Sequence, residues 1–170
     1  MVMASQMLGR AFFKAGLYPQ CYSLFGGERR GAPVVSFLRV DRKKILLKCD
    51  IKRPDEMLYF DAGLIDPDEV GALRSAERSI LVSTGQQDTG MEILRGFRVG
   101  IVNAPAIARG LGLGRVINTT ILGAYCRLSG NLPFEHILAA IEEMVPAKRE
   151  ANVEAARQGY AGLTMLKGEN

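Results

Sequence analysis

The chain has 170 residues, of which 48% are hydrophobic and 24% are charged, and its formal net charge is +4. This length suits one domain with a sizeable hydrophobic core, and the composition is that of an ordinary globular protein. Acidic residues are interspersed with the basic ones, whereas nucleic-acid binding usually needs a concentrated basic face. We therefore expect no nucleic-acid partner.

The three cysteines do not form a metal-binding pattern. Cys21, Cys49 and Cys126 lie far apart without C-x-x-C spacing, and the chain has a single histidine, His136. Iron–sulfur clusters usually take four cysteine ligands, and a structural zinc ion takes four ligands in total. An odd cysteine count without a signal peptide indicates reduced thiols in a cytoplasm. Charge-free stretches are shorter than the roughly 20 residues that span a bilayer, so we expect no membrane partner.

The N-terminal segment is predicted to be an amphipathic helix over residues 2–15, because its apolar residues recur at spacings of three and four. Gly16 is its expected end. No Ser, Thr, Asp or Asn precedes the apolar stripe to cap it. A helix that begins buried normally has chain in front of it, so we expect that residues are missing upstream of Met1.

Strands are predicted for the next part of the chain. Val34–Val40 is apolar and β-branched, residues 41–43 form a polar turn, and Lys44–Ile51 predicts a second strand. The short connection favours an antiparallel hairpin between these two strands. Glu56–Phe60 predicts a further short strand.

The rest of the chain alternates between strands and helices and then becomes helical. Strands are predicted over Ser79–Ser83 and Arg98–Val102. Helices are predicted over a short segment that opens at Pro67, over Asn103–Arg109 and Asn118–Ser129, from Pro133 or Phe134 to Val145, and over Pro146–Tyr160. We expect Asn118 to cap its helix and Gly130 to end it. This order predicts a three-layer α/β/α domain with a mixed, mostly parallel sheet and a helical C-terminal third. We expect one domain over residues 1–162 and a frayed tail over residues 163–170.

A glycine-bounded basic loop is the most informative motif. Residues 25–33 read Phe-Gly-Gly-Glu-Arg-Arg-Gly-Ala-Pro and come directly before the strand Val34–Val40. Glycines allow unusual backbone angles, and the guanidinium groups of Arg29 and Arg30 suit carboxylates and phosphates. The segment is therefore either a shaped anion-binding loop or a solvated turn with an Arg–Glu pair.

Other candidate motifs do not complete an active site. The glycines of Gly110–Gly114 follow a predicted helix, whereas a dinucleotide fingerprint follows a strand, so a helix stop is favoured. The loop Thr84–Gln87 follows a strand, where ligand sites are common, but its sequence favours a plain surface loop. His136 has no assignable nucleophile, and the adjacent Glu142 and Glu143 point apart on a helix. We assign no catalytic residue, and expect any chemistry to lie partly on other chains.

Two parts of the chain resemble one enzyme family. The loop of residues 25–33 with the strand that ends in Arg39 resembles the gamma subunits of 2-oxoacid:ferredoxin oxidoreductases of the pyruvate and 2-ketoisovalerate type. Val116-Ile-Asn-Thr-Thr-Ile-Leu-Gly-Ala124 matches that family's helix opening. Residues 132–160, with Ile141-Glu-Glu, Pro146-Ala-Lys148 and Glu150-Ala-Asn152, resemble its closing helices. Family members usually begin with a strand and a glycine-rich loop, whereas this chain begins inside the helix that follows them.

The resemblance implies a function in a complex. Such enzymes decarboxylate a 2-oxoacid, form an acyl-CoA and pass electrons to ferredoxin, with thiamine diphosphate and iron–sulfur clusters held by other subunits. This chain would hold no cofactor alone, and its partners would be alpha, beta and delta subunits or their equivalents. The matching positions would contact a neighbouring subunit or an anionic group near the active site: Gly26, Gly27, Glu28, Arg29, Arg30, Gly31 and Asn118.

Two rival interpretations stay open at this point. The glycine run Gly110–Gly114 and the loop after Ser83 allow a stand-alone nucleotide-binding or regulatory module. A purely structural subunit without any contact to substrate is also consistent with the sequence.

Overall fold

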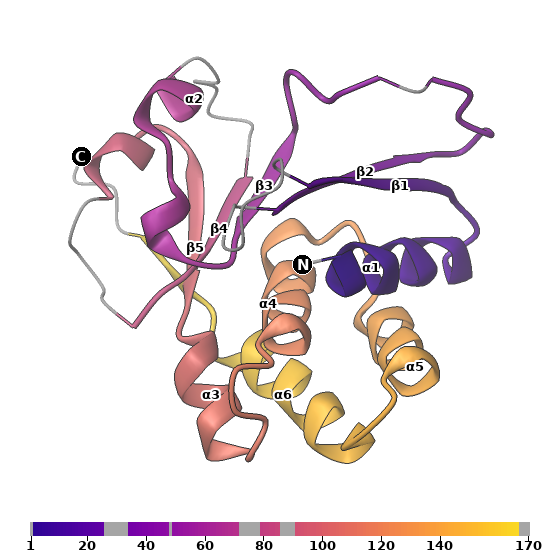
Figure 1. Ribbon diagram of the computed structural model, residues 1–170, viewed down its shortest axis with the longest axis vertical. Helices are drawn as coiled ribbons and strands as arrows, with labels where there is room; N and C mark the ends of the chain where they lie inside the picture. The colour runs from indigo at the N-terminus through magenta and orange to yellow at the C-terminus, as the bar shows by residue number, and fades with distance from the viewer. Residues whose placement is uncertain (1, 26–33, 48, 72–78, 86–90, 167–170) are drawn as a thin grey trace.

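A computed structural model describes residues 2–25, 34–47, 49–71, 79–85 and 91–166 of the chain (Figure 1). The helices are α1 (Val2–Lys14), α2 (Pro67–Gly71), α3 (Ala104–Gly110), α4 (Asn118–Ser129), α5 (Phe134–Met144) and α6 (Arg149–Ala161). The strands are β1 (Tyr18–Phe25), β2 (Val34–Asp41), β3 (Glu56–Tyr59), β4 (Ser79–Ser83), β5 (Arg98–Val102) and β6 (Thr164–Met165). In the described part of the chain, no helix has the length and apolar character needed to cross a membrane.

The central sheet has the strand order β3-β4-β5-β6. Strands β3, β4 and β5 run parallel, and β6 pairs antiparallel with β5. Side chains alternate between the two faces of a strand. Leu81 of β4 and Val102 of β5 therefore join the core beneath α1, α4 and α5, whereas Ile80 and Val82 join a second core with Val70 of α2. The expected three layers and mixed, mostly parallel sheet are confirmed.

Helix α4 lies at the centre of the helical layer and is buried almost along its whole length. It crosses α6 where each helix has a glycine, Gly123 and Gly159. A Cβ atom at Gly123 would overlap the carbonyl oxygen of Ala156, and one at Gly159 would overlap that of Thr120. The missing side chains thus allow the two backbones to touch. Beside this crossing, the buried Thr119 hydroxyl donates to Asn152 Oδ1 at 3.1 Å.

A separate two-stranded sheet lies beyond α1, where β1 pairs antiparallel with β2 from Tyr18↔Asp41 to Phe25↔Val34 (Figure 1). The prediction that Val34–Val40 pairs with Lys44–Ile51 is wrong. The partner of β2 is the preceding segment, whose strand was not predicted because Pro19 and scattered polar residues obscure its pattern. A two-stranded sheet has only edge strands, so Pro19 needs no backbone N–H there.

Three smaller expectations also need correction. Ile117, not Asn118, is the N-cap of α4, and no side-chain hydrogen bond caps this helix. Helix α6 begins at Arg149 because Lys148 takes a left-handed backbone conformation, with φ of 51°, so Pro146 belongs to the preceding connection. The tail is not frayed throughout, since Thr164–Met165 forms β6 and the Leu166 N–H donates to the Val99 carbonyl.

Candidate subunit interface on the β1–β2 hairpin

The predicted basic loop joins β1 to β2. Residues 26–33 lie outside the described part of the chain, and this includes Gly26, Gly27, Glu28, Arg29, Arg30 and Gly31. The strands on either side are described and end at the facing pair Phe25 and Val34. The loop therefore connects the two strands at one end of the hairpin.

Asn118, the remaining predicted contact residue, lies on the first turn of α4 and is half-buried. Among the described hydrogen bonds, none joins its side chain to the hairpin. The sequence-based grouping of Asn118 with the basic loop thus stays a prediction.

The hairpin has an inner face that packs against α1. A Cβ atom at Gly9 would lie within 4 Å of Cys21, Pro19 and Leu38, which alternate along the two strands on this face. The Cys21 thiol donates to the Ser5 carbonyl at 3.2 Å, and burial raises its pKa. Cys21 is accordingly held as a neutral thiol that ties β1 to α1.

The outer face of the hairpin carries aromatic and cationic side chains. Tyr22 and Phe37 are cross-strand neighbours whose ring centroids lie 4.9 Å apart in a stacked arrangement. The Arg39 guanidinium lies 5.9 Å from the centre of the Tyr22 ring, within the range of a cation–π contact. Such aromatic and arginine groups are enriched at protein interfaces.

Arg39 also fixes the returning chain against this outer face. Its Nη2 donates to the Asp50 carbonyl at 3.2 Å and lies 3.5 Å from Cys49 Sγ. The Tyr22 hydroxyl donates to the Cys49 carbonyl at 2.5 Å. Between β1 and this segment lies a cavity of about 310 Å³, lined by Gln20, Cys21, Tyr22, Cys49 and Asp50. The Tyr22 and Arg39 donors are thus engaged by the backbone of the returning chain, and no general base is paired with a nucleophile among these residues.

The rival nucleotide-binding interpretation loses one of its two supports, the glycine run Gly110–Gly114, in the structure. Helix α3 ends at Gly110, and Gly112 and Gly114 follow with positive φ angles of 66° and 63° in a turn. No strand comes directly before these glycines, and no helix begins directly at them, so they do not form a dinucleotide fingerprint. Of the loop after Ser83, Gln86 and Gln87 lie outside the described residues.

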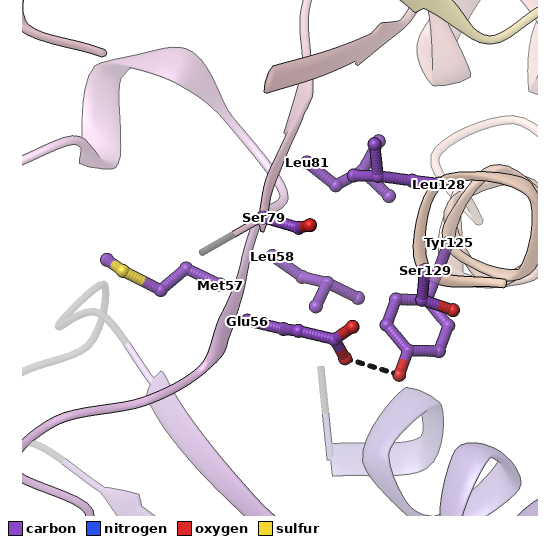
Figure 2. Close-up of a pocket in the computed structure, with 8 residues that line it drawn as sticks. All are labelled: Glu56, Met57, Leu58, Ser79, Leu81, Tyr125, Leu128 and Ser129. Carbon is purple, nitrogen blue, oxygen red and sulfur yellow. Dashed lines mark hydrogen bonds between the residues drawn. The ribbon is translucent and has the colours of Figure 1, made fainter. Parts of the chain in front are cut away.

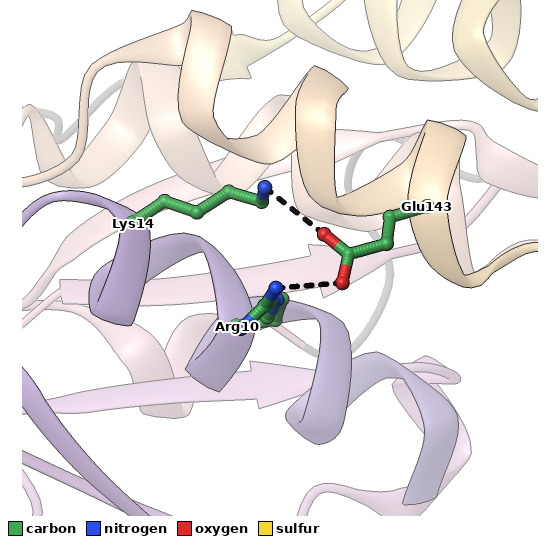
Figure 3. A network of polar contacts seen from close by, with 3 residues as sticks. All are labelled: Arg10, Lys14 and Glu143. Atoms are coloured by element: carbon green, nitrogen blue, oxygen red, sulfur yellow. Dashed lines mark ion pairs between the residues drawn. The ribbon is translucent and has the colours of Figure 1, made fainter.

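The remaining titratable residues singled out in the sequence do not come together as a site. His136 is half-buried on α5, and Glu142 is exposed. Glu143 accepts from Arg10 Nη2 at 2.7 Å and from Lys14 Nζ at 2.9 Å, so it ties α5 to α1 (Figure 3). Within the described ranges, no three His, Cys, Asp or Glu side chains come together as a metal site would require.

Comparison with known proteins decides the family. The model of the family "Pyruvate ferredoxin/flavodoxin oxidoreductase" matches residues 1–162. The chain belongs to this family. Among its relatives, the common subunit gamma of the pyruvate/ketoisovalerate oxidoreductases of Pyrococcus furiosus is 37% identical over 94% of this chain and 88% of its own. Pyruvate synthase subunit PorC of Methanothermobacter thermautotrophicus is 33% identical over 98% of this chain and 91% of its own.

A solved member of the pyruvate oxidoreductase family has the same fold. The crystal structure of pyruvate oxidoreductase subunit PORC from Thermotoga maritima superimposes with a TM-score of 0.81 at 30% identity, covering 98% of this chain and 91% of that one. The resemblance drawn from the basic loop and the C-terminal helices is therefore confirmed, together with the expected fold class.

One polar site in this family member was missed by the sequence analysis. The Tyr125 hydroxyl of α4 donates to Glu56 Oε2 of β3 at 2.6 Å (Figure 2). Asn131 Nδ2 donates to the other carboxylate oxygen of Glu56 at 3.1 Å. Burial, followed by the charge of Glu56, raises the pKa of Tyr125 and keeps it protonated. The two partners lie 69 residues apart, so no local sequence pattern could reveal the pair.

Proposed function

We propose that this chain is the gamma subunit of a multi-subunit 2-oxoacid:ferredoxin oxidoreductase and is inactive alone. The observation that carries the proposal is the similarity to gamma and PorC subunits over nearly the whole chain. The relatives are named for pyruvate and for pyruvate together with ketoisovalerate, so the substrate is a small or branched-chain 2-oxoacid.

The chemistry requires groups that this chain does not supply among its described residues. Thiamine diphosphate, iron–sulfur clusters and coenzyme A would provide decarboxylation, electron transfer and the acyl acceptor in the assembled complex. We place the first two on alpha, beta and delta subunits or their equivalents, with ferredoxin as the electron acceptor. The compartment that we propose is the cytoplasm, and the free cysteines Cys21, Cys49 and Cys126 support it.

The proposed contribution of this chain is a contact surface. Residues Gly26–Gly31 join the strands at the end of the hairpin, and arginines in such a loop suit an anionic group or a carboxylate on a neighbour. We assign Glu28, Arg29, Arg30 and the flanking glycines, with Asn118, to contacts near the active site of the complex.

Co-expression with the larger subunits tests the function. Purification through a tag on a large subunit should recover this chain in a fixed ratio, and the complex should reduce ferredoxin with a 2-oxoacid and coenzyme A. The purified chain alone should show no such activity. Failure to co-purify, together with nucleotide binding by the isolated chain, would favour the stand-alone module.

Replacing Arg29 and Arg30 by alanine tests the loop. We expect weaker assembly or a Michaelis constant raised about tenfold or more for the 2-oxoacid or coenzyme A, because charge-assisted contacts to an anion would be lost. Unchanged assembly together with unchanged Michaelis constants would remove the loop from the contact surface.

A further inference from the structure

Exposed apolar side chains gather on one side of the β1–β2 hairpin. Tyr18, Leu24 and Val35 are 48%, 46% and 49% exposed. Leu24 and Val35 are cross-strand neighbours, and both lie on the same face as the Tyr22–Phe37 pair. This is the outer face, since the alternate residues of both strands pack against α1.

The chain that follows β2 adds to this apolar side. It returns along the hairpin on the side opposite to α1, as Figure 1 shows. Its hydrogen bonds through Cys49 and Asp50 attach it to Tyr22 and Arg39. Nevertheless Leu46 and Leu47 are 80% and 64% exposed. We call Tyr18, Leu24, Val35, Leu46 and Leu47, with Arg39 beside them, the docking surface.

Large apolar side chains that gather on one side of a protein are typical of an interaction site.

The charges around the docking surface indicate what covers it. Cations outnumber acids in the described residues from 39 to 55: Arg39, Arg42, Lys43, Lys44, Lys52 and Arg53 against Asp41, Asp50 and Asp55. Two copies of this chain meeting through this face would bring like charges together, which is unfavourable at an interface. A partner surface with acidic residues around an apolar centre would be complementary to the docking surface both in charge and in apolar character.

We propose that the docking surface binds a neighbouring subunit of the same oxidoreductase, which presents an apolar patch bordered by carboxylates. The inference rests on the proposed function only in requiring that such a neighbour exists. Tyr22 lies between Tyr18 and Leu24 along β1, and together with Arg39 it holds the returning chain beside them.

The test replaces Leu46 by aspartate in the co-expressed complex. Leu46 lies in no helix or strand and is largely exposed, so Leu46→Asp should leave the fold intact. We expect its recovery with the tagged large subunits to fall about tenfold or more, because a charge replaces apolar contact and faces the partner's carboxylates. The matched control is Val116→Asp, at a site 46% exposed in the connection between α3 and α4, which should co-purify as the unchanged chain does.

Each outcome of this test bears on a different claim. Equal recovery of Leu46→Asp and the unchanged chain would overturn the docking surface while leaving the proposed function intact. Failure of the unchanged chain to co-purify would instead contradict the proposed function. An isolated chain that forms dimers disrupted by Leu46→Asp would show that a second copy covers the surface, which would also overturn the inference.

Alkylation of Cys49 gives a second measurement that does not depend on a substitution. Its thiol is exposed and lines the cavity beside Arg39. Peptide mapping after treatment with N-ethylmaleimide should show Cys49 labelled about tenfold more slowly in the purified complex than in the isolated chain. Equal labelling rates in the two samples would place the partner elsewhere.

Discussion

At the scale of single residues, the Tyr125–Glu56 contact provides a pH-dependent test of packing (Figure 2). Tyr125→Phe removes a hydrogen bond to a charged acceptor, so we expect a loss of about 1–2 kcal/mol in the free energy of unfolding at pH 7. Because the folded pKa of Tyr125 lies above the ordinary value of 10.0, the unfolded chain ionises first and stability falls above that pH. The difference in the free energy of unfolding between the unchanged chain and Tyr125→Phe should therefore become smaller in alkaline solution. Urea titrations at several pH values would show this.

Tyr59→Phe is the matched control for this substitution. The Tyr59 hydroxyl is buried and has no hydrogen-bond partner among the described atoms. Its removal at pH 7 should leave stability unchanged or slightly higher, since no bond is lost. Equal losses in Tyr59→Phe and Tyr125→Phe would mean that the bond to Glu56 contributes nothing measurable.

Gly123 tests the contact between the backbones of α4 and α6. A Cβ atom there meets backbone atoms of Ala156, which cannot turn aside as a flexible side chain can. We expect Gly123→Ala to lower the free energy of unfolding by about 3 kcal/mol, at the upper end of overpacking effects. In Gly110→Ala the new methyl group meets open space, and urea unfolding should give a change within about 0.5 kcal/mol. Similar values for the two variants would contradict the close crossing.

At the scale of elements, Glu143 links α5 to α1 through Arg10 and Lys14 (Figure 3). The hydrogen bond from Arg10, followed by that from Lys14, lowers the pKa of Glu143 below its ordinary value of 4.5. A lowered folded pKa means that the stabilisation is present above pH 4.5 and is lost as the pH falls through the folded value. The Glu143→Gln protein should therefore be less stable than the unchanged chain at pH 7. This difference in stability should disappear in acid.

Salt and a neighbouring residue provide the controls for Glu143. The site is open to solvent, so the difference at pH 7 should also shrink in concentrated sodium chloride. Glu142→Gln removes an adjacent, exposed carboxylate that makes none of the described ion pairs, and thermal unfolding should be unchanged. A Glu143→Gln effect on stability that does not shrink as the pH falls below 4.5 would show a packing defect rather than a lost charge.

The elements with a regular apolar pattern could be predicted, and those defined by distant pairing could not. Ile137 and Ile141 are buried at a spacing of four on α5, so the helical period of its apolar residues could be recognised in the sequence. Ser79–Ser83 was likewise recognised as a buried strand. Strand β1 was missed because its face is set by β2 and α1, not by its own composition. Leu46 and Leu47 gave Lys44–Ile51 the composition of a strand, but they are surface residues without a strand partner in the described chain.

The candidate site was predictable only in part for the same reason. The glycines and arginines of the loop form a local motif that the sequence alone reveals, and their role as a contact site stays a prediction. The docking surface needs the register of β1 with β2 and the return of the chain across Tyr22 and Arg39, and both depend on contacts between distant residues. A motif can be recognised from residues that are close in the sequence, whereas an interface is formed by residues that only folding brings together.

At the scale of the whole molecule, binding of the docking surface should stabilise the fold by mass action. A partner that binds only the folded chain adds about 2.7 kcal/mol when its concentration is 100 times its dissociation constant. For a chain of this length, that corresponds to a rise of about 5–10 °C in the unfolding midpoint. The midpoint should keep rising as more partner is added, because each increase in concentration shifts the equilibrium further.

Proteolysis at increasing temperature, read from peptides of this chain alone, measures that midpoint inside the mixture. The unchanged chain and Val116→Asp should show the rise as purified large subunits are added, and Leu46→Asp should require about tenfold more partner for the same rise. The three proteins should share one midpoint without partner, because Leu46 and Val116 are both exposed. A Leu46→Asp midpoint that is already low without partner would assign its effect to folding, whereas equal rises in all three proteins would exclude this surface as the one that the partner covers.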